Sequence, residues 1–302
     1  MPFAARPEFD WRLRTRTLGL GRRTLVMGIL NVTPDSFSDG GHFYSPGDAP
    51  DRAIEHALHM LDEGADILDI GGESTRPGAN PLTPEEEQAR ILPVIEALVK
   101  QRPEAVLSVD TFHAVTARRA IEAGVEIVND VSGHQWDPGM AETCASAGCG
   151  VVLMHTRGRP QDWRSQQPLD EDEVVPLVLD GLKGRLRAAL AGGIARERIV
   201  LDPGFGFGKR LDENYPLLAR LSELRQLNMP ILAGVSRKSF LANAIARKLG
   251  GPPEGLAPQD RLNATTAANT VAILAGAHVL RVHDVSAAVE AAAIADRILG
   301  VV

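Results

Sequence analysis

Cysteine is scarce in this sequence, and its scarcity excludes two ways of stabilising a fold. Cys144 and Cys149 are the only cysteines among 302 residues, which is too few for a disulfide scaffold. They also lack the second Cys/His pair that a structural zinc site requires. We therefore expect two free thiols in a reducing compartment. The core must then depend on the apolar residues, which make up 44% of the chain.

Long apolar runs and long basic runs are missing as well. No stretch approaches the roughly 18 consecutive apolar residues of a transmembrane helix, and residues 1–20 lack the apolar centre of a signal peptide. The formal net charge is −7 and no run of Lys and Arg exceeds three residues, which argues against a nucleic-acid surface. We expect a cytoplasmic protein that binds neither a membrane nor nucleic acid.

What the sequence does contain is a repeated alternation of short apolar runs with longer segments of helical periodicity. This alternation is typical of βα units. Runs that are apolar through most of their length indicate parallel strands covered by helices on both faces. The eight runs of strand length are 24–30, 66–72, 106–110, 126–130, 150–155, 199–204, 230–236 and 279–284. Eight such units predict a (β/α)8 TIM barrel, and we expect a single domain over residues 1–302.

The main alternative to the barrel is an open, doubly wound sheet, in which ligand-binding groups gather at one switch point. Here unusual polar residues follow nearly every strand. That distribution favours the barrel, whose active site collects the C-terminal ends of all its strands. Residues 1–23 form an N-terminal extension. Within it, residues 9–23 alternate apolar and polar side chains around Gly19 and Gly21, which predicts a hairpin covering the barrel bottom.

The first two strands are each followed by a long polar loop. In the first loop, 27–41, Asn31 offers a neutral oxygen ligand of the kind that suits Mg²⁺. In the second, 69–78, Arg76 stands in a glycine-rich turn, where it could bind a carboxylate or a phosphate through two hydrogen bonds. Ordinary surface loops are the alternative interpretation of both segments.

Asp110, Asn129 and Asp202 end the third, fourth and sixth strands. A single carboxylate in such a place is more often the N-cap of the next helix. Three of these groups converging at the mouth of one barrel can instead bind a flat heterocycle. Carboxylates accept hydrogen bonds from its N–H edge, and Asn both donates and accepts.

The glycines of segment 202–209 match neither the dinucleotide-binding nor the P-loop spacing. We expect Gly204, Gly206 and Gly208 to let the backbone approach a planar ligand closely. Phe205 would then lie near one face of that ligand.

Two further segments carry cationic or hydroxyl groups at strand ends. After the seventh strand, a simple helix cap is the alternative role of Ser236. Lys238 and Ser239 open a helix whose free N–H groups can hold a small carboxylate. At the end of the eighth strand, alternation directs Arg281 and His283 to the same side, which predicts a pyrophosphate site. The alternative is a surface ion pair between Arg281 and the neighbouring Asp284.

These motifs, in this order, resemble those of the dihydropteroate synthase family from about residue 24 onward. The matching segments are MGILNVTPDSFSDGG, DIGGESTRPG, SVDT, NDVSG, MH, DPGFGFGK, SRKSF and RVHDV. The resemblance implies a transferase of folate biosynthesis. Its reaction would condense 6-hydroxymethyl-7,8-dihydropterin pyrophosphate with p-aminobenzoate, in an SN1-like displacement that releases pyrophosphate and 7,8-dihydropteroate.

The same resemblance implies roles for individual residues. Residues with a part in catalysis would be Lys238, Asp110, Asp202, Arg281 and His283. Residues at the pterin would be Asp110, Asn129, Met154, Asp202 and Lys238. Phe205 and Gly206 belong to the expected substrate site through the glycine pattern of segment 202–209 described above. Residues at the pyrophosphate would be Asn31, as the Mg²⁺ ligand, Arg281 and His283. The first two loops and the segment after the seventh strand would complete the substrate site, chiefly around p-aminobenzoate. The residues there are Asp35, Phe37, Thr75, Arg76, Pro77, Lys238 and Ser239.

The resemblance also implies competition by sulfonamides and a homodimer. Residues 264–275 could supply the dimer interface or could equally pack against the barrel. Two other interpretations stay open. One is a pterin-binding domain of the methyltransferase kind, and the other is a pterin-binding paralogue without catalysis.

Overall fold

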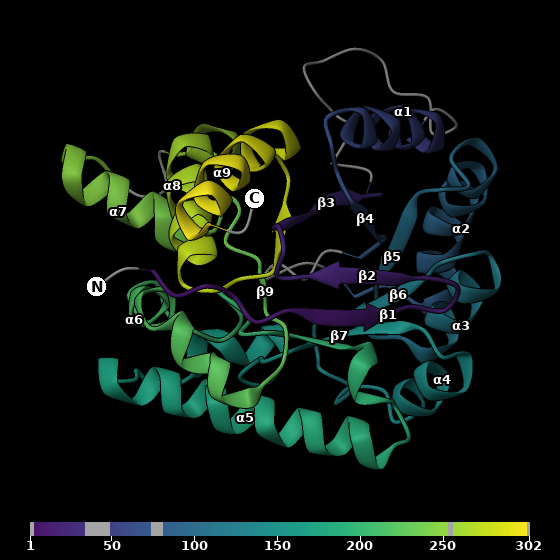
Figure 1. Cartoon of the computed structure of the whole chain (residues 1–302), viewed down its shortest axis with the longest axis horizontal. Helices are drawn as coiled ribbons and strands as arrows, with labels where there is room; N and C mark the ends of the chain where they lie inside the picture. Colours follow the sequence, from purple (N-terminus) through teal and green to yellow (C-terminus); the bar gives the residue numbers. More distant parts are fainter. Residues whose placement is uncertain (1–2, 34–48, 74–80, 253–255, 301–302) are drawn as a thin grey trace.

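Each of the eight apolar runs contains a parallel strand in the structure (Figure 1). The structure is a computed structural model, and it describes residues 3–33, 49–73, 81–252 and 256–300. The strands are β3 (Leu25–Asn31), β4 (Ile67–Gly71), β5 (Val106–Asp110), β6 (Ile127–Asp130), β7 (Gly150–Met154), β8 (Ile199–Asp202), β9 (Leu232–Ala233) and β10 (Val279–Val282). They are hydrogen-bonded in the order β8-β7-β6-β5-β4-β3-β10-β9. A parallel bridge between Leu201 and Ile231 joins the two end strands, so the expected TIM barrel is confirmed.

Helices surround this barrel (Figure 1). The α-helices are α1 (Ala49–Asp62), α2 (Pro84–Gln101), α3 (Ala114–Glu122), α4 (Met140–Ala147), α5 (Glu171–Ala191), α6 (Asn214–Ala219), α7 (Ser239–Leu249), α8 (Leu262–Leu274) and α9 (Val285–Leu299). The shorter 3₁₀ helices are η1 (Pro160–Ser165), η2 (Arg196–Arg198), η3 (Leu221–Leu227) and η5 (Pro258–Arg261). Within the described residues, no helix combines the length and the apolar character needed to cross a membrane.

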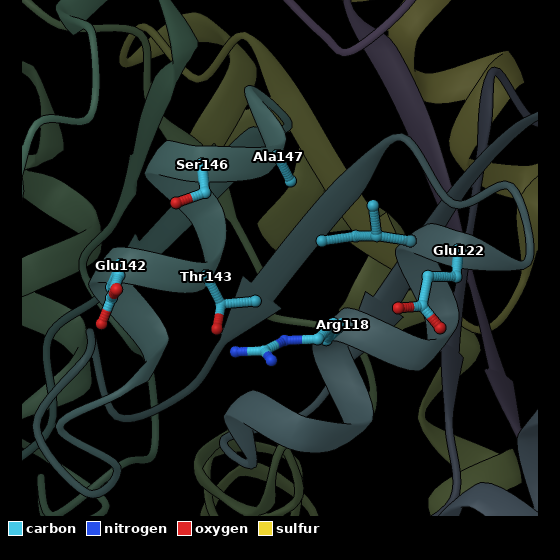
Figure 2. Close-up of a pocket in the computed structure, with 7 residues that line it drawn as sticks. Arg118, Glu122, Glu142, Thr143, Ser146 and Ala147 are labelled. Carbon is cyan, nitrogen blue, oxygen red and sulfur yellow. The ribbon is translucent and has the colours of Figure 1, made fainter.

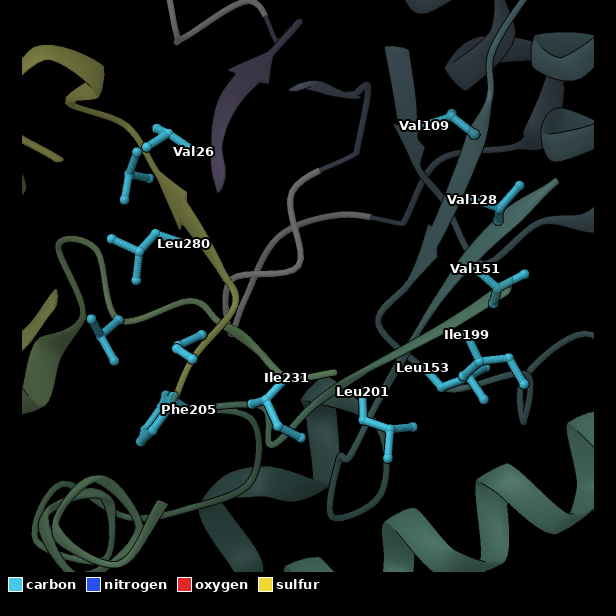
Figure 3. Close-up of a cluster of buried hydrophobic side chains, with 14 of the residues drawn as sticks. Val26, Val109, Val128, Val151, Leu153, Ile199, Leu201, Phe205, Ile231 and Leu280 are labelled. Carbon is cyan, nitrogen blue, oxygen red and sulfur yellow. The ribbon is translucent and has the colours of Figure 1, made fainter. Parts of the chain in front are cut away.

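Side-chain alternation along the strands divides the apolar residues into two groups. One group points outward and packs beneath the helices, as Val109, Val128, Val151 and Leu280 do in Figure 3. The other group points into the barrel at the N-terminal ends of the strands. Its strand members are Leu25, Met27, Ile67, Val106, Ile127, Val152, Val200, Leu232 and Val279. The inward group forms an apolar floor. The inward positions above this floor, nearer the C-terminal ends of the strands, carry polar side chains.

The predicted N-terminal hairpin closes this floor from below. Strands β1 (Phe9–Arg12) and β2 (Thr17–Leu20) pair antiparallel and cross the barrel end in Figure 1. Trp11 is 1% exposed and belongs to the same apolar cluster as the floor. At Gly150 an added Cβ would lie 2.5 Å from Cδ2 of Leu13, so the small residue on β7 leaves room for the hairpin. The expectation that this segment covers the barrel bottom is confirmed.

Candidate active site

A fully buried carboxylate, Asp69 on β4, organises the polar layer above the apolar floor. It accepts hydrogen bonds from Ser108 Oγ on β5 at 2.6 Å, from Asn129 Nδ2 on β6 at 2.8 Å and from Arg281 Nε on β10 at 2.6 Å. Four strands are therefore connected through one side chain. A charge away from water is tolerated only when it is paired and hydrogen-bonded, and Asp69 meets both conditions.

Arg281 also reaches a second carboxylate at the barrel mouth. Its Nη2 donates to Oδ2 of Asp110, the last residue of β5, at 2.5 Å. Burial raises the pKa of Asp110 to about 7; Arg281 opposes this shift and Asp69 adds to it. For Arg281 itself, burial lowers the pKa but the two carboxylates outweigh it, so the net shift is upward. The guanidinium therefore stays charged and fixes the spacing of the two acids.

The alternative pairing of Arg281 with Asp284 is wrong. Asp284 instead accepts from Arg237, at 2.5 Å from Nη2 and 3.0 Å from Nε. The interpretation of Ser236 as a helix cap is also wrong, because α7 begins at Ser239 with Lys238 in the cap position. Ser236 Oγ lies 3.0 Å from Nδ1 of His283 and accepts from its backbone N–H, which connects the ends of the seventh and eighth barrel strands.

A narrow pocket opens beside this network, and it contains several of the residues expected at the site. Those that line it are Asn129, Val131, Met154, Asp202, Phe205, Phe207, Gly234, Lys238 and Arg281. Burial raises the pKa of Asp202, whose Oδ1 accepts from the Gly204 N–H at 2.7 Å. The Lys238 ammonium lies 4.1 Å from the ring centroid of Phe207, within the range of a cation–π interaction.

The two phenylalanines of the 202–209 segment have different surroundings. Phe205 is 1% exposed and belongs to the apolar cluster drawn in Figure 3. Its ring stacks on Phe240 at a centroid distance of 6.4 Å. The aromatic ring beneath Lys238 belongs to Phe207. At Gly206 an added Cβ would lie 3.3 Å from Cδ of Lys238, so this backbone does approach the pocket closely.

Asn31 ends β3 at the rim of the barrel and is half-buried. Its side chain forms no hydrogen bond to another residue in the described ranges, which leaves the amide oxygen available to a ligand. The described part of the chain also contains no group of three or more His, Cys, Asp or Glu able to hold a metal. Asp35 and Phe37, as well as Thr75, Arg76 and Pro77, lie outside the described residues.

Sequence reasoning missed Asp69 and Phe207. The signal for Asp69 was present, because a carboxylate between Ile67 and Gly71 on the inward face of a buried strand needs partners. No comparable signal separated Phe207 from Phe205, since both follow glycine in the same short repeat.

A wider pocket lies elsewhere, between α3 and α4 on the outside of the barrel (Figure 2). The residues that line it are Arg118, Ile121, Glu122, Glu142, Thr143, Ser146 and Ala147. None of them belongs to a strand end, so this pocket is separate from the polar mouth. The pocket at the strand ends is the better candidate because it combines a buried acid, an amide and two cations in one place.

Comparison with known proteins identifies the family of the chain. The family model described as pterin binding enzyme matches residues 27–283. Dihydropteroate synthase of Escherichia coli (strain K12) is 44% identical over 266 residues, which is 88% of each chain. The enzyme of the same name from Synechocystis is 41% identical and covers 95% of this chain and 91% of its own.

Solved structures of such enzymes are similar throughout. Xanthomonas albilineans dihydropteroate synthase with 4-aminobenzoic acid superposes with a TM-score of 0.85 at 42% identity, over 97% of this chain and 98% of that one. The Yersinia pestis enzyme in a sulfonamide drug complex gives 0.84 at 42% identity, over 96% and 98%. The Xanthomonas enzyme in complex with 7,8-dihydropteroate gives 0.81 at 40% identity, over 97% and 98%.

Proposed function

Because the chain belongs to the dihydropteroate synthase family, we propose that its polar barrel mouth is the site of this family's reaction. The chain is a transferase that condenses 6-hydroxymethyl-7,8-dihydropterin pyrophosphate with p-aminobenzoate. The exocyclic C–O bond to pyrophosphate breaks and a C–N bond to the aniline nitrogen forms. The products are 7,8-dihydropteroate, pyrophosphate and the proton that the nitrogen loses.

The observation that carries the proposal is the set of buried hydrogen-bonding groups around the strand-end pocket. Asn129, Asp202 and Lys238 line it, and Asp110 is connected to it through Arg281. The edge of a pterin carries N–H donors beside ring-nitrogen and carbonyl acceptors. Carboxylates match the donors, and Asn129 and Lys238 match the acceptors. A site of this kind also rejects ligands that leave its buried polar groups unpaired.

Arg281 and His283 would bind the pyrophosphate of the substrate. Arg281 lies at the pocket, and the hydrogen bond from Ser236 holds His283 at the end of the same strand, β10. Neutralising the leaving group in a buried site lowers the barrier to its departure. As C–O cleavage proceeds, positive charge spreads over the pterin ring, where Asp110 and Asp202 stabilise it.

Asn31 would hold Mg²⁺ together with oxygens of the pyrophosphate. This ion takes few protein ligands and keeps waters and substrate phosphates as the rest, so a single available amide oxygen fits it. When bound, the ion would withdraw charge from the leaving group.

Ser239 would bind the second substrate. It opens α7, and the free N–H groups there suit the carboxylate of p-aminobenzoate. Phe37, Thr75, Arg76 and Pro77 stay predictions for the same site. Sulfonamides would compete with p-aminobenzoate, as the drug complex of the Yersinia relative suggests.

Two further proposals concern the cellular compartment of the protein and its oligomeric state. The free thiols of Cys144 and Cys149 are both buried, which supports the cytoplasm as the compartment. Fractionation that found the protein outside the cytoplasm would contradict this placement. A homodimer is supported by exposed apolar side chains on the outer helices α8 and α9.

We expect pyrophosphate release from the pterin substrate to require both p-aminobenzoate and Mg²⁺. The reason is that the nucleophile captures the cationic carbon, while the metal offsets the charge of the leaving group. Pyrophosphate quantified by ion chromatography after quenching, with and without aminobenzoate in Mg²⁺ and then in EDTA, measures this. Pterin binding without release would favour the paralogue or methyltransferase-like alternatives, and release unaffected by EDTA would remove the Mg²⁺ assignment.

Substitution should distinguish the roles of the two cationic residues of the pocket, Lys238 in turnover and Arg281 in substrate binding. Lys238→Ala should lower kcat on the order of 100-fold or more, because it removes the ammonium beside the reacting pterin. Arg281→Ala should chiefly raise the KM for pterin pyrophosphate, by roughly 10- to 100-fold, since it removes charged hydrogen bonds. Steady-state kinetics with each substrate varied would show this. His56→Ala, on the exposed face of α1, is the matched control. Wild-type constants for either pocket variant would contradict its assignment.

The homodimer would form through α8 and α9. Residues 264–275 overlap α8, one face of which packs inward, while Val271 on its other face is 45% exposed. Ile294 and Ile298 on α9 are 64% and 53% exposed. Ile294→Glu should convert a dimer to a monomer in sedimentation velocity, whereas Val115→Glu, on exposed α3, should not. A monomeric wild type would contradict the proposal.

A further inference from the structure

The loop between β8 and α6 forms one wall of the strand-end pocket. Gly204, Gly206 and Gly208 have φ values of 68°, 80° and 70°, a left-handed conformation that side chains disfavour. The loop therefore curls tightly, and Phe205 and Phe207 between these glycines both line the pocket. A curl of this kind turns backbone carbonyls inward, and they need partners there.

Lys209 supplies those partners. Its side chain is buried, the residue being 5% exposed, and Nζ donates to the carbonyl of Gly204 at 2.7 Å. Longer hydrogen bonds of 3.3 Å go to the carbonyls of Phe207 and His155. An ammonium group has three donors, so this arrangement uses all of them. The side chain thus fills a cage of backbone oxygens and is turned away from solvent.

The three carbonyls belong to segments that shape the pocket. His155 follows Met154, which lines the pocket from β7. Phe207 provides the ring beneath the Lys238 ammonium. Lys209 therefore connects the end of one barrel strand to the loop after the next, and through Phe207 it is connected to Lys238.

The electrostatic surroundings of this buried lysine are mixed. Burial lowers the pKa of Lys209 to about 7. Asp202 and Glu213 favour the charged form, whereas Lys238 and Arg157 oppose it. Burying a charged group is costly, and neutral donors could also form hydrogen bonds with the backbone carbonyls of this short loop. The cost is understandable if the loop must be held in one conformation.

We propose that Lys209 is a positioning residue, which holds the 203–208 loop so that Phe207 supports Lys238 at the pterin. The proposal rests on the assignment of the pocket to the pterin pyrophosphate. Other contacts to the loop are independent of Lys209, since Asn214 Oδ1 accepts from the Gly206 N–H at 2.7 Å. Arg157 Nη1 donates to the Gly208 carbonyl at 3.3 Å. Removal of the ammonium should therefore displace the loop without unfolding the barrel.

Lys209→Met tests this, because it keeps the length of the side chain and removes its donors. The matched control is Lys183→Met, on the exposed side of α5. Two readouts are needed. Amide hydrogen exchange of the 203–208 loop requires no turnover, and kinetics with pterin pyrophosphate varied reports the function of the pocket. Thermal unfolding of both variants shows whether the fold survives.

In Lys209→Met we expect faster exchange confined to the loop and the end of β7. We also expect kcat/KM for pterin pyrophosphate to fall on the order of 100-fold, the loss typical of a displacement of about 1 Å. A lower melting temperature with unchanged exchange and unchanged kcat/KM would overturn the proposal, since Lys209 would then only stabilise the fold. Faster exchange without loss of kcat/KM would also overturn it. A wild-type protein without turnover would instead refute the proposed function, and the exchange result would be unaffected.

Discussion

The ion pair between Asp69 and Arg281 is the interaction on which the barrel mouth depends. It joins β4 to β10 across β3, at a level where the side chain of Asp69 is 0% exposed. Ser108 and Asn129 also donate hydrogen bonds to the Asp69 carboxylate, and Nη2 of Arg281 donates to Asp110. A single buried acid thereby fixes the positions of a cation, an amide and a second acid. Losing either partner of such a pair leaves an uncompensated buried charge, which costs several kcal/mol.

This polar layer depends in turn on the apolar floor beneath it. Inward positions alternate along each strand, so the same strand contributes Ile67 to the floor and Asp69 to the layer above. The hairpin closes the floor with Trp11, which is 1% exposed. Burial then has a chemical effect at the mouth, where it raises the pKa values of Asp110 and Asp202. Electrostatic stabilisation of a developing charge is strongest in such surroundings.

The sequence was sufficient for features that depend on local pattern. The eight strands and the hairpin followed from apolar alternation, and the barrel followed from the number of βα units. It also identified Asn129, Asp202 and Lys238 at strand ends, and the structure brings them to one pocket. The sequence did not reveal which side chains on distant strands form hydrogen bonds with each other. The partners of Arg281 are 212 and 171 residues away, and only closure of the barrel makes them neighbours.

Asp69 acts on substrate binding through Arg281, whose position it fixes. A double-mutant cycle with Asp69→Asn and Arg281→Met, read as calorimetric affinity for pterin pyrophosphate without aminobenzoate, tests this most directly. We expect the two losses of affinity to be strongly non-additive. With Arg281 already replaced, Asp69→Asn should weaken binding little further, giving a coupling energy of about 1 kcal/mol or more. Losses that simply add would show that the two residues contribute to the site independently, and Asp69 would then have no effect through Arg281.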